Sequence, residues 1–543
     1  MQSQPSAPAQ TAALTALAQL HQNAPFEPVA RINYQSQGRL LIIGSGERVR
    51  QACAALQGTL SMAVLWTGLD AAPAINEVEV LPGELVALTG YLGAFELSWR
   101  TAAGAPAQIA QFDLILDVGQ SPQLTQPQPP QGYFHAANAD TFAHACATLP
   151  DMVGEFEKPK FFAYKESICA HSRSRQQGCN KCIDICSTRA ISSAGDIVAV
   201  DAHLCMGCGA CATVCPSGAM TYQYPRVADR GAELRAMLAA YRAADAAAAA
   251  PVFLFHHLDE EKLQALPLAA NVLPVEAWHV ASIGLDVMLG ALAYGAAGVV
   301  VLANGDEAEG YAAASQGEMQ TGETILHALG YAGTHFAWAG AESCATQIAA
   351  IGQSSGVTAV ATFHLSNDKR ATLEFAIEHF AKFATAKPVE IALKAGSLYG
   401  AIVVNQDTCT MCLACAGACP ESALMDGGEI LQLKFLERNC VQCGLCANTC
   451  PEKAITLVPR LLMTDTRKHA VVLNETEPFD CISCGKALGT KKLIDNMLGK
   501  LAGHSMFQSE GSLKRLQMCA DCRVVDMMSN KNEMSVLTGR PIE

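Results

Sequence analysis

Sixteen of the 23 cysteines in this chain fall into four short runs, and the runs stand in two pairs. The first pair consists of Cys169, Cys179, Cys182 and Cys186, followed by Cys205, Cys208, Cys211 and Cys215. The second pair consists of Cys409, Cys412, Cys415 and Cys419, followed by Cys440, Cys443, Cys446 and Cys450. Three of the four runs read C-x2-C-x2-C-x3-C-P, the spacing typical of thiolates that hold a cubane iron–sulfur cluster. The cysteines therefore predict a fold built around several [4Fe–4S] clusters.

The spacing also predicts which cysteines share a cluster. The first three cysteines of a run surround one cluster, while the fourth begins a short helix and reaches the other cluster of the pair. The expected ligand sets are crossed, and we number them clusters 1 to 4. They are Cys169, Cys179, Cys182 and Cys215 for cluster 1; Cys205, Cys208, Cys211 and Cys186 for cluster 2; Cys409, Cys412, Cys415 and Cys450 for cluster 3; and Cys440, Cys443, Cys446 and Cys419 for cluster 4.

The internal repeat extends beyond the cysteines. A proline follows three of the runs, where its fixed φ suits the first turn of a helix. A pair of apolar residues then stands at the same offset after every run: Ala190-Ile191, Ala219-Met220, Ala423-Leu424 and Ala454-Ile455. Such residues are predicted to cover the clusters and keep water away from them.

The first run departs from this pattern. Nine residues, 170–178, separate Cys169 from Cys179, and Ser187 takes the place of the proline. The insert is basic and polar, which fits either a docking loop at the exposed edge of cluster 1 or a solvated loop. Cys169 also has two interpretations, since it either completes cluster 1 or leaves a site with three cysteines.

The alternative of a disulfide framework has little support. Residues 1–28 lack the basic start and apolar core of a secretory signal, and paired C-x2-C motifs in a reducing compartment indicate metal binding. We therefore expect a cytoplasmic protein. The formal net charge of −14 argues against a nucleic-acid partner and favours a redox partner with a basic docking face, although acidity also simply favours solubility.

The apolar segment 287–303 is short for a membrane span and is interrupted by glycines. We expect no membrane span here. The segment instead predicts a helix over 286–294 and a buried strand over 299–302.

The chain is predicted to be multidomain, α/β plus α+β, with two α/β domains interleaved with two ferredoxin-like modules. The segments are a flexible N-terminal tail (1–30) with an Ala- and Leu-rich helix, an α/β domain (31–150), a ferredoxin-type 2[4Fe–4S] module (151–226), a second α/β domain (227–400), a second ferredoxin-type 2[4Fe–4S] module (401–460) and a C-terminal four-cysteine module (461–543). The second α/β domain is expected to open with an alanine-rich helix over 232–250.

A glycine-rich turn in the first α/β domain raises the question of a nucleotide. The expected strand 39–44 ends in Gly44-Ser45-Gly46 and leads into an expected helix over 47–56, which is the context of a phosphate-binding turn. Val49 occupies the third glycine position, and Asp70 only loosely matches the acidic residue of the motif. The turn therefore gives little support to bound flavin or NAD(P), and plain strand-to-helix turn chemistry explains it as well.

Four further cysteines predict a metal site near the C-terminus. Cys481, Cys484, Cys519 and Cys522 form two C-x2-C knuckles, the usual way to give zinc four thiolates in a zinc-ribbon-like module. The gap between them holds an expected helix near 491–501 and is long for such a module. A fifth iron–sulfur cluster and a metal-free thiol pair remain as alternatives.

Together these motifs resemble bacterial cytoplasmic multi-cluster ferredoxin-type proteins, of the kind encoded beside molybdenum-dependent formate dehydrogenases. The resemblance lies in GCNKCIDIC…LCMGCGACATVCP, in CTMCLACAGACP…CVQCGLCANTCP and in the tail CISCGKALGTKKLI…GHSMF…RLQMCADCRV. It implies electron transfer to or from a formate-oxidising or similar enzyme. Under the electron-transfer hypothesis, no residue of this chain needs to act as an acid, base or nucleophile, so we name no catalytic residue. Two other hypotheses are a flavin- or NAD(P)-linked oxidoreductase subunit and an assembly factor for a molybdoenzyme.

Overall fold

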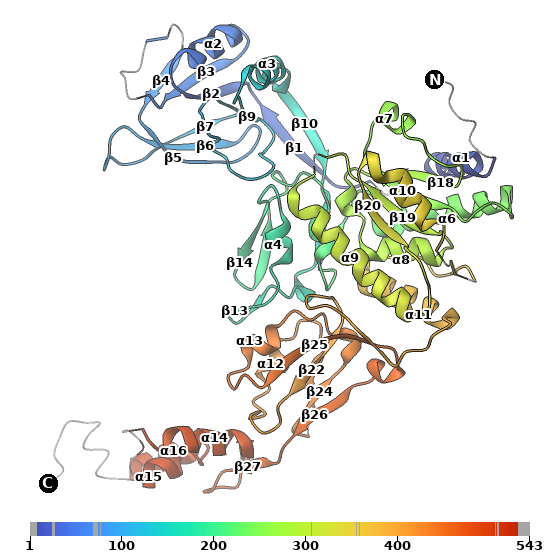
Figure 1. Cartoon of the computed structure of the whole chain (residues 1–543). Helices are drawn as coiled ribbons and strands as arrows, with labels where there is room; N and C mark the ends of the chain where they lie inside the picture. The colour runs from blue at the N-terminus through green and yellow to red at the C-terminus, as the bar shows by residue number, and fades with distance from the viewer. Residues whose placement is uncertain are drawn as a thin grey trace. The chain divides into compact units, whose positions relative to one another are not determined.

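The computed structural model of the chain describes residues 8–23, 26, 28–68, 74–75, 78–305, 307–354, 356–357, 359–428, 430–504, 507 and 510–529 (Figure 1). Asp70 and part of the predicted tail lie outside them. The chain divides into two compact units: unit 1 is Met1–Tyr164, Lys181–Ala194 and Val198–Thr385, and unit 2 is Lys165–Asn180, Gly195–Ile197 and Ala386–Glu543. These units do not follow the six predicted segments one by one, and that division stays a prediction.

The first α/β domain of unit 1 has three layers. Its middle layer is a parallel sheet of order β4-β3-β2-β8-β9, formed by β2 (Arg39–Gly44), β3 (Ser61–Trp66), β4 (Glu79–Pro82), β8 (Leu114–Asp117) and β9 (Tyr133–His135). The outer layers are the helices α2 (Glu47–Leu56) and α3 (Ala139–Thr148), and an antiparallel sheet of β5 (Glu84–Thr89), β6 (Phe95–Arg100) and β7 (Gln108–Phe112). Leu40 and Ile42 belong to the core on the helical side, and Leu41 and Ile43 to the core on the other side. From Leu40 to Ile43, strand β2 is apolar and buried because both faces of its sheet are covered.

The second α/β domain is also built on a parallel sheet. The order is β18-β17-β19-β20, with β17 (Val252–His256), β18 (Val272–Glu276), β19 (Gly298–Leu302) and β20 (Phe336–Ala339). Its helices are α6 (Val227–Ala244), α7 (Glu260–Gln264), α8 (Leu285–Ala293), α9 (Glu309–Ala328), α10 (Ala341–Ile351) and α11 (Lys369–Phe383), with the short 3-10 helix η3 (Val280–Ser282). The helix and strand expected within 287–303 are confirmed as α8 and β19.

The described part of the predicted tail is helical and packed. Helix α1 (Pro8–Asn23) lies along α6, and its Ala9 and Ala13 are buried. Gln10 Nε2 donates a hydrogen bond of 2.6 Å to the main-chain oxygen of Val272. Residues 8–23 therefore form part of the second α/β domain.

Short elements surround the cysteine runs. Around the first pair, unit 1 contains β11 (Phe162–Tyr164), α4 (Lys181–Ile185), β14 (Ile191–Ala194), α5 (Ala210–Val214) and β16 (Met220–Tyr222). Unit 2 contains η2 (Glu166–Ile168), β12 (Ser172–Arg173) and β13 (Gln176–Gln177). Strand β15 (Ile197–Val200) has its first residue in unit 2 and its other residues in unit 1. The remaining elements of unit 1 are η1 (Leu149–Met152) and the antiparallel ribbon β1 (Arg31–Ser36) with β10 (Gly154–Pro159).

Around the second pair of runs, two three-stranded sheets flank two short helices. The sheets have the orders β21-β25-β22 and β23-β24-β26. Their elements are β21 (Glu390–Ala392), β22 (Gly400–Val404), α12 (Ala414–Ala418), β23 (Leu424–Asp426), β24 (Gln432–Phe435), η4 (Glu437–Asn439), α13 (Leu445–Thr449), β25 (Ile455–Leu462), η5 (Asp465–Lys468) and β26 (Val471–Glu475).

The C-terminal part combines one hairpin with helices. It contains β27 (Pro478–Asp480), β28 (Ala487–Thr490), α14 (Lys491–Leu501), α15 (Glu510–Arg515) and α16 (Ala520–Ser529). The helix expected near 491–501 is α14. The first cysteine knuckle lies in the hairpin and the second at the start of α16, so the two knuckles differ in structure.

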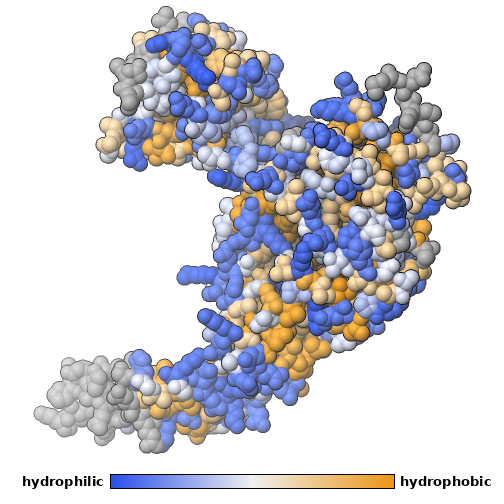
Figure 2. All heavy atoms as spheres, viewed as in Figure 1, coloured by the Kyte–Doolittle hydropathy of each residue, from blue (hydrophilic) through white to orange (hydrophobic). Residues whose placement is uncertain are grey.

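No helix among the described residues combines the length and apolar composition needed to cross a bilayer. On the face drawn in Figure 2, hydrophilic and hydrophobic residues are intermixed.

Candidate iron–sulfur centres

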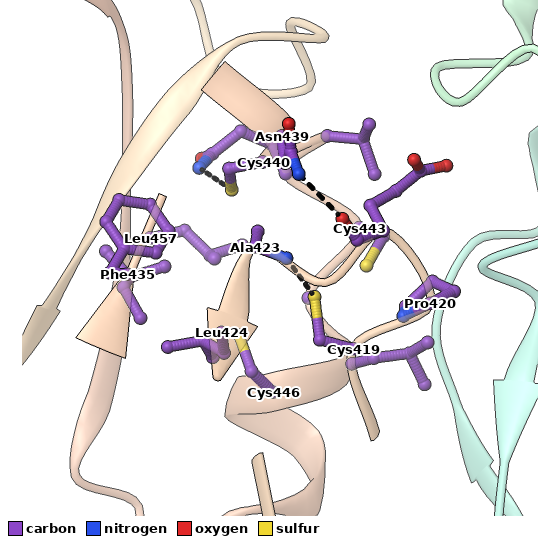
Figure 3. Close-up of a pocket in the computed structure, with 16 residues that line it drawn as sticks. Cys419, Pro420, Ala423, Leu424, Phe435, Asn439, Cys440, Cys443, Cys446 and Leu457 are labelled. Carbon is purple, nitrogen blue, oxygen red and sulfur yellow. Dashed lines mark hydrogen bonds between the residues drawn. The ribbon is translucent and has the colours of Figure 1, made fainter. Parts of the chain in front are cut away.

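The best-defined cysteine set lies in unit 2 and is the one predicted for cluster 4. Cys419, Cys440, Cys443 and Cys446 line one cavity, and Figure 3 shows their sulfur atoms facing a common space. The rest of the wall is largely apolar, with Ile402, Pro420, Ala423, Leu424, Phe435, Val441, Leu445 and Leu457. Such a wall is the dry surround that an iron–sulfur cluster needs.

The sets predicted for clusters 3 and 2 are gathered in the same way. Cys409, Cys412, Cys415 and Cys450 line a second cavity of unit 2, together with Met411, Leu433 and Ile455. Cys186, Cys205, Cys208 and Cys211 line a cavity of unit 1, together with Phe161, Ala190, Ile191 and Val200. In both sets, the fourth cysteine of one run stands beside the first three cysteines of the other run.

The set predicted for cluster 1 is divided between the two units. Cys169 and Cys179 belong to unit 2, whereas Cys182 and Cys215 belong to unit 1. Each unit is described by itself, so this ligand set stays a prediction.

The backbone of the three regular runs shares a feature that the sequence does not reveal. The residues on both sides of the second cysteine of each run have left-handed φ values. These are 80° and 78° at Gly207 and Gly209, 56° and 59° at Met411 and Leu413, and 53° and 82° at Gln442 and Gly444. Loops of this kind form concave nests of main-chain N–H groups that bind anions. A cubane with four thiolates is anionic, so these loops fit it. In the first run, the neighbours of Cys182 are helical residues of α4 instead.

A second backbone repeat follows the fourth cysteine of every run. The residue three positions later has a left-handed φ of 53° at Arg189, 73° at Gly218, 50° at Ser422 and 50° at Lys453. This turn brings main-chain N–H groups back to the sulfur in three runs. The donor–acceptor distances are 3.4 Å from Met220 to Cys215, 3.2 Å from Ala423 to Cys419 and 3.3 Å from Ala454 to Cys450.

The repeated apolar pairs have the burial predicted for them. All eight residues are buried: Ala190, Ile191, Ala219, Met220, Ala423, Leu424, Ala454 and Ile455. Their position explains why the repeat continues past the cysteines.

Burial also disfavours the thiolate form of these cysteines in the absence of a cation. It raises the pKa of Cys205 to about 11, and the pKa values of Cys415 and Cys443 to about 12, with neighbouring thiols adding to the effect. Burial likewise raises the pKa of Cys446 and of Cys211. Only thiolates bind iron, so loading a cluster requires the release of these protons and the iron cations offset the buried negative charge.

The insert in the first run forms a hairpin that packs inside unit 2. Its strands β12 and β13 pair Ser172 with Gln177. Asn448 Nδ2, on α13, donates a hydrogen bond of 2.7 Å to the main-chain oxygen of Gln177. The negative charge of Cys179 contributes to the raised pKa of Cys443, after burial and the nearer thiols. The insert is therefore an internal contact with the second ferredoxin-like module, and neither of the two predicted roles described this contact.

The sulfur atoms of the four C-terminal cysteines lie close together. Their sulfur atoms all lie within 4.8 Å of one another, and Cys484 Sγ is 3.7 Å from Cys519 Sγ. A single tetrahedral ion with metal–sulfur bonds of about 2.3 Å needs sulfur separations of about 3.8 Å. The main-chain N–H of Cys519 donates to Cys481 Sγ (3.2 Å) and lowers the pKa of the Cys481 thiol. The geometry therefore fits one ion better than a wider cubane.

The glycine turn of the first α/β domain has a packing role. A Cβ on Gly44 would lie 2.5 Å from Cγ2 of Val118, so the close approach of β2 to the residue after β8 requires glycine. Gly46 is the N-cap of α2, with a φ of 73°. A nucleotide at Gly44 and Gly46 stays a prediction.

Comparison with known proteins supports the iron–sulfur assignment. Residues 177–219 and residues 401–451 each match a family described as a 4Fe-4S dicluster domain. The chain is also 30% identical over 88 residues to hydrogenase-4 component A of Escherichia coli (strain K12), covering 15% of this chain and 40% of that protein. The chain thus spans less than half of that relative. The first match begins after Cys169, so this cysteine stays a predicted ligand. Two dicluster domains imply four [4Fe–4S] clusters, and the chain contains two iron–sulfur modules of the ferredoxin type.

Proposed function

We propose that the chain is an electron-transfer protein, in which four [4Fe–4S] clusters pass single electrons between redox protein partners. The observation that supports this best is the gathering of three crossed cysteine sets around three largely apolar cavities. The clusters supply one-electron redox chemistry when bound. The chain holds them with thiolates, shields them from water and surrounds them with main-chain N–H donors.

The two modules are proposed to exchange electrons within the chain. The hairpin 172–177 packs on α13, and Cys179 lies close enough to Cys443 to affect its pKa. Under the crossed wiring, Cys179 belongs to cluster 1 and Cys443 to cluster 4. We therefore propose that electrons pass between the cluster bound by Cys179 and the cluster bound by Cys443.

We propose the cytoplasm as the compartment and a single structural zinc ion at the C-terminal cysteines. For the cytoplasm, the support is the set of paired C-x2-C motifs, which are typical of metal-binding thiols in a reducing compartment. For zinc, the support is the short spacing of the four sulfur atoms.

Iron and acid-labile sulfide analysis of anaerobically purified protein tests the main proposal. Four clusters require about 16 iron atoms and about 16 sulfides per chain. A redox titration followed by EPR should then resolve several one-electron signals. Colourless protein without labile sulfide would exclude the function.

The most specific partner we propose is a formate dehydrogenase, on the strength of the motifs in the cysteine runs and the tail. Formate with a formate dehydrogenase should bleach the cluster absorbance anaerobically, whereas formate alone should not. Dithionite serves as the positive control. Clusters that dithionite reduces but formate with the enzyme does not would contradict this partner while leaving the electron-transfer function intact.

A further inference from the structure

A tyrosine from the second α/β domain contacts a cysteine that lines the cavity predicted for cluster 2. Tyr311 lies near the start of α9, with 1% of its surface exposed, and its hydroxyl donates a hydrogen bond of 3.0 Å to Cys208 Sγ. It packs with Ala210 of α5 and Ala281 of η3. His279 meets its ring edge-on, with centroids 5.4 Å apart. The phenol is therefore fixed by packing on several sides.

The Tyr311 hydroxyl has one proton and two neighbours that could accept it. Ser187 Oγ lies 2.5 Å away, and Cys208 Sγ lies 3.0 Å away. A cluster ligand is an anionic thiolate, which accepts hydrogen bonds more strongly than a neutral hydroxyl and cannot donate one. The Tyr311 proton is therefore directed to Cys208, and Ser187 is the donor to Tyr311. In the structure, Ser187 Oγ also lies 2.7 Å from Gln128 Oε1 and donates to it. Donation from Ser187 to Tyr311 thus requires the Gln128 amide to turn, so that its NH2 group faces Ser187 in place of the oxygen.

This donor differs in origin from those at the fourth cysteines. Cys215, Cys419 and Cys450 accept from main-chain N–H groups of their own modules. Tyr311 instead comes from a helix about 100 residues farther along the chain, and it ends beside Ser187, the residue that replaces the proline of the other runs. The serine gives the phenol a hydrogen-bond donor that proline would lack.

We propose that Tyr311 raises the reduction potential of cluster 2, and this inference rests on the proposed electron-transfer function. Reduction adds negative charge that the cluster shares with its thiolate sulfurs. A buried donor at one sulfur stabilises the reduced cluster more than the oxidised one, and hydrogen bonds to sulfur are a main determinant of cluster potentials. Tyr311 is a positioning residue, since it acts through the ligand Cys208. An electron on cluster 2 is therefore held more tightly than it would be without the phenol.

The test compares redox titrations of three full-length proteins by EPR: the unchanged chain, Tyr311→Phe and Tyr331→Phe. Tyr311→Phe keeps the ring and its packing but removes the donor. Tyr331→Phe is the matched control because Tyr331 is also buried, lies just after α9 and donates to the main-chain oxygen of Phe380 at 3.0 Å. A fourth variant, Cys208→Ser, identifies the signal of cluster 2 by changing one of its ligands.

In Tyr311→Phe, the signal of cluster 2 should move to a more negative potential while the other signals stay in place. The free energy of a hydrogen bond to a charged group is large enough to change the ratio of reduced to oxidised cluster about tenfold at a fixed potential. For one electron, this corresponds to a midpoint shift of about 59 mV. Tyr331→Phe should leave all midpoints unchanged. Full iron content with an unshifted cluster 2 would overturn this inference but not the proposed function, whereas absence of iron in the unchanged chain would overturn the proposed function.

Ser187→Ala provides a second test in case the Tyr311→Phe protein does not bind cluster 2. This variant retains the phenol but removes the donor to its oxygen, so the hydrogen bond to Cys208 weakens and the same signal moves in the same direction by a smaller amount. An unchanged midpoint in Ser187→Ala would then count against the role of Tyr311.

Discussion

Gly178 and Leu445 are in such close contact that no larger residue fits at position 178 without movement. A Cβ on residue 178 would lie 2.6 Å from Leu445 Cγ and 2.4 Å from the main-chain oxygen of Ala170. Both partners belong to unit 2, so the contact holds the insert of the first run against α13. The neighbouring hydrogen bond from Asn448 to Gln177 fixes the same hairpin.

Replacing Gly178 with alanine should therefore destabilise unit 2. Overpacking of this kind costs about 1–3 kcal/mol, which urea unfolding of the variant would measure. Gly499→Ala is the matched control, because Gly499 lies in helix α14 and a Cβ there meets nothing within 4 Å. The control should be more stable by about 0.5–1 kcal/mol. A Gly178→Ala protein as stable as the unchanged chain would show that the hairpin does not depend on this contact.

Cys169→Ser tests the ligand that lies outside both matched segments. If Cys169 completes cluster 1, the variant should lose the signal of that cluster, and iron should fall from about 16 to about 12 atoms per chain. Conversion of cluster 1 to a three-iron form, with the loss of about one iron atom and a distinct EPR signal, would also support Cys169 as a ligand. An unchanged iron content and an unchanged spectrum would exclude Cys169 as a ligand.

The stability of the iron-free protein should depend on alkaline pH. The pKa values of Cys205, Cys415 and Cys443 are raised to about 11, 12 and 12 in the fold. In the unfolded chain, a thiol has a pKa of about 8.5, so between these values the folded state binds more protons than the unfolded state. The free energy of unfolding should therefore fall as the pH rises above about 8.5 and be unaffected by these thiols below it.

Urea unfolding of iron-stripped protein at several pH values from 7 to about 10 would measure this slope. A variant with Cys415→Ala and Cys443→Ala should have a shallower slope. Equal slopes in the two proteins would mean that other groups cause the pH dependence.

Removal of the C-terminal metal should leave the clusters intact. Anaerobic purification should give about one zinc per chain, and Cys519→Ser should abolish zinc binding without changing the iron content. Because a metal bound by the four cysteines would join the β27–β28 hairpin to the start of α16, its loss should expose 476–529 to limited proteolysis. Iron-loaded protein with no zinc at these cysteines would refute the zinc assignment.

Sequence patterns predicted the local elements well where one physical cause dominates. The apolar run 40–43 and the glycine turn after it predicted β2 and α2, because a parallel strand covered on both faces is apolar where it is buried. The alanine-rich helix was predicted less well. It starts at Val227 and ends at Ala244, where Asp245 turns the chain and its side chain accepts from Ala247 N at 2.9 Å. Alanine propensity alone would have carried the helix on to Pro251.

Features of the cluster sites that rest on distant or non-glycine residues could not be read from the sequence. Met411 and Leu413 have left-handed backbones although neither residue type favours them, since the loop around Cys412 imposes this shape. The approach of Tyr311 to Cys208 and of Asn448 to Gln177 depends on tertiary packing. The contact between Tyr311 and Ser187 had one possible signal in the sequence: Ser187 stands where the other three runs have a proline.

The hydrogen bond between Asn448 and Gln177 also sets a time order for biosynthesis, because its partners are 271 positions apart. At a translation rate of about 5–20 residues per second, the ribosome makes α13 roughly 14–54 s after the hairpin. During that interval, the hairpin and the neighbouring Cys179 lack the packing surface of α13, which has not yet been synthesised. The support of the hairpin before Cys179 is thus completed late in synthesis, and iron delivered earlier would meet Cys179 without that support.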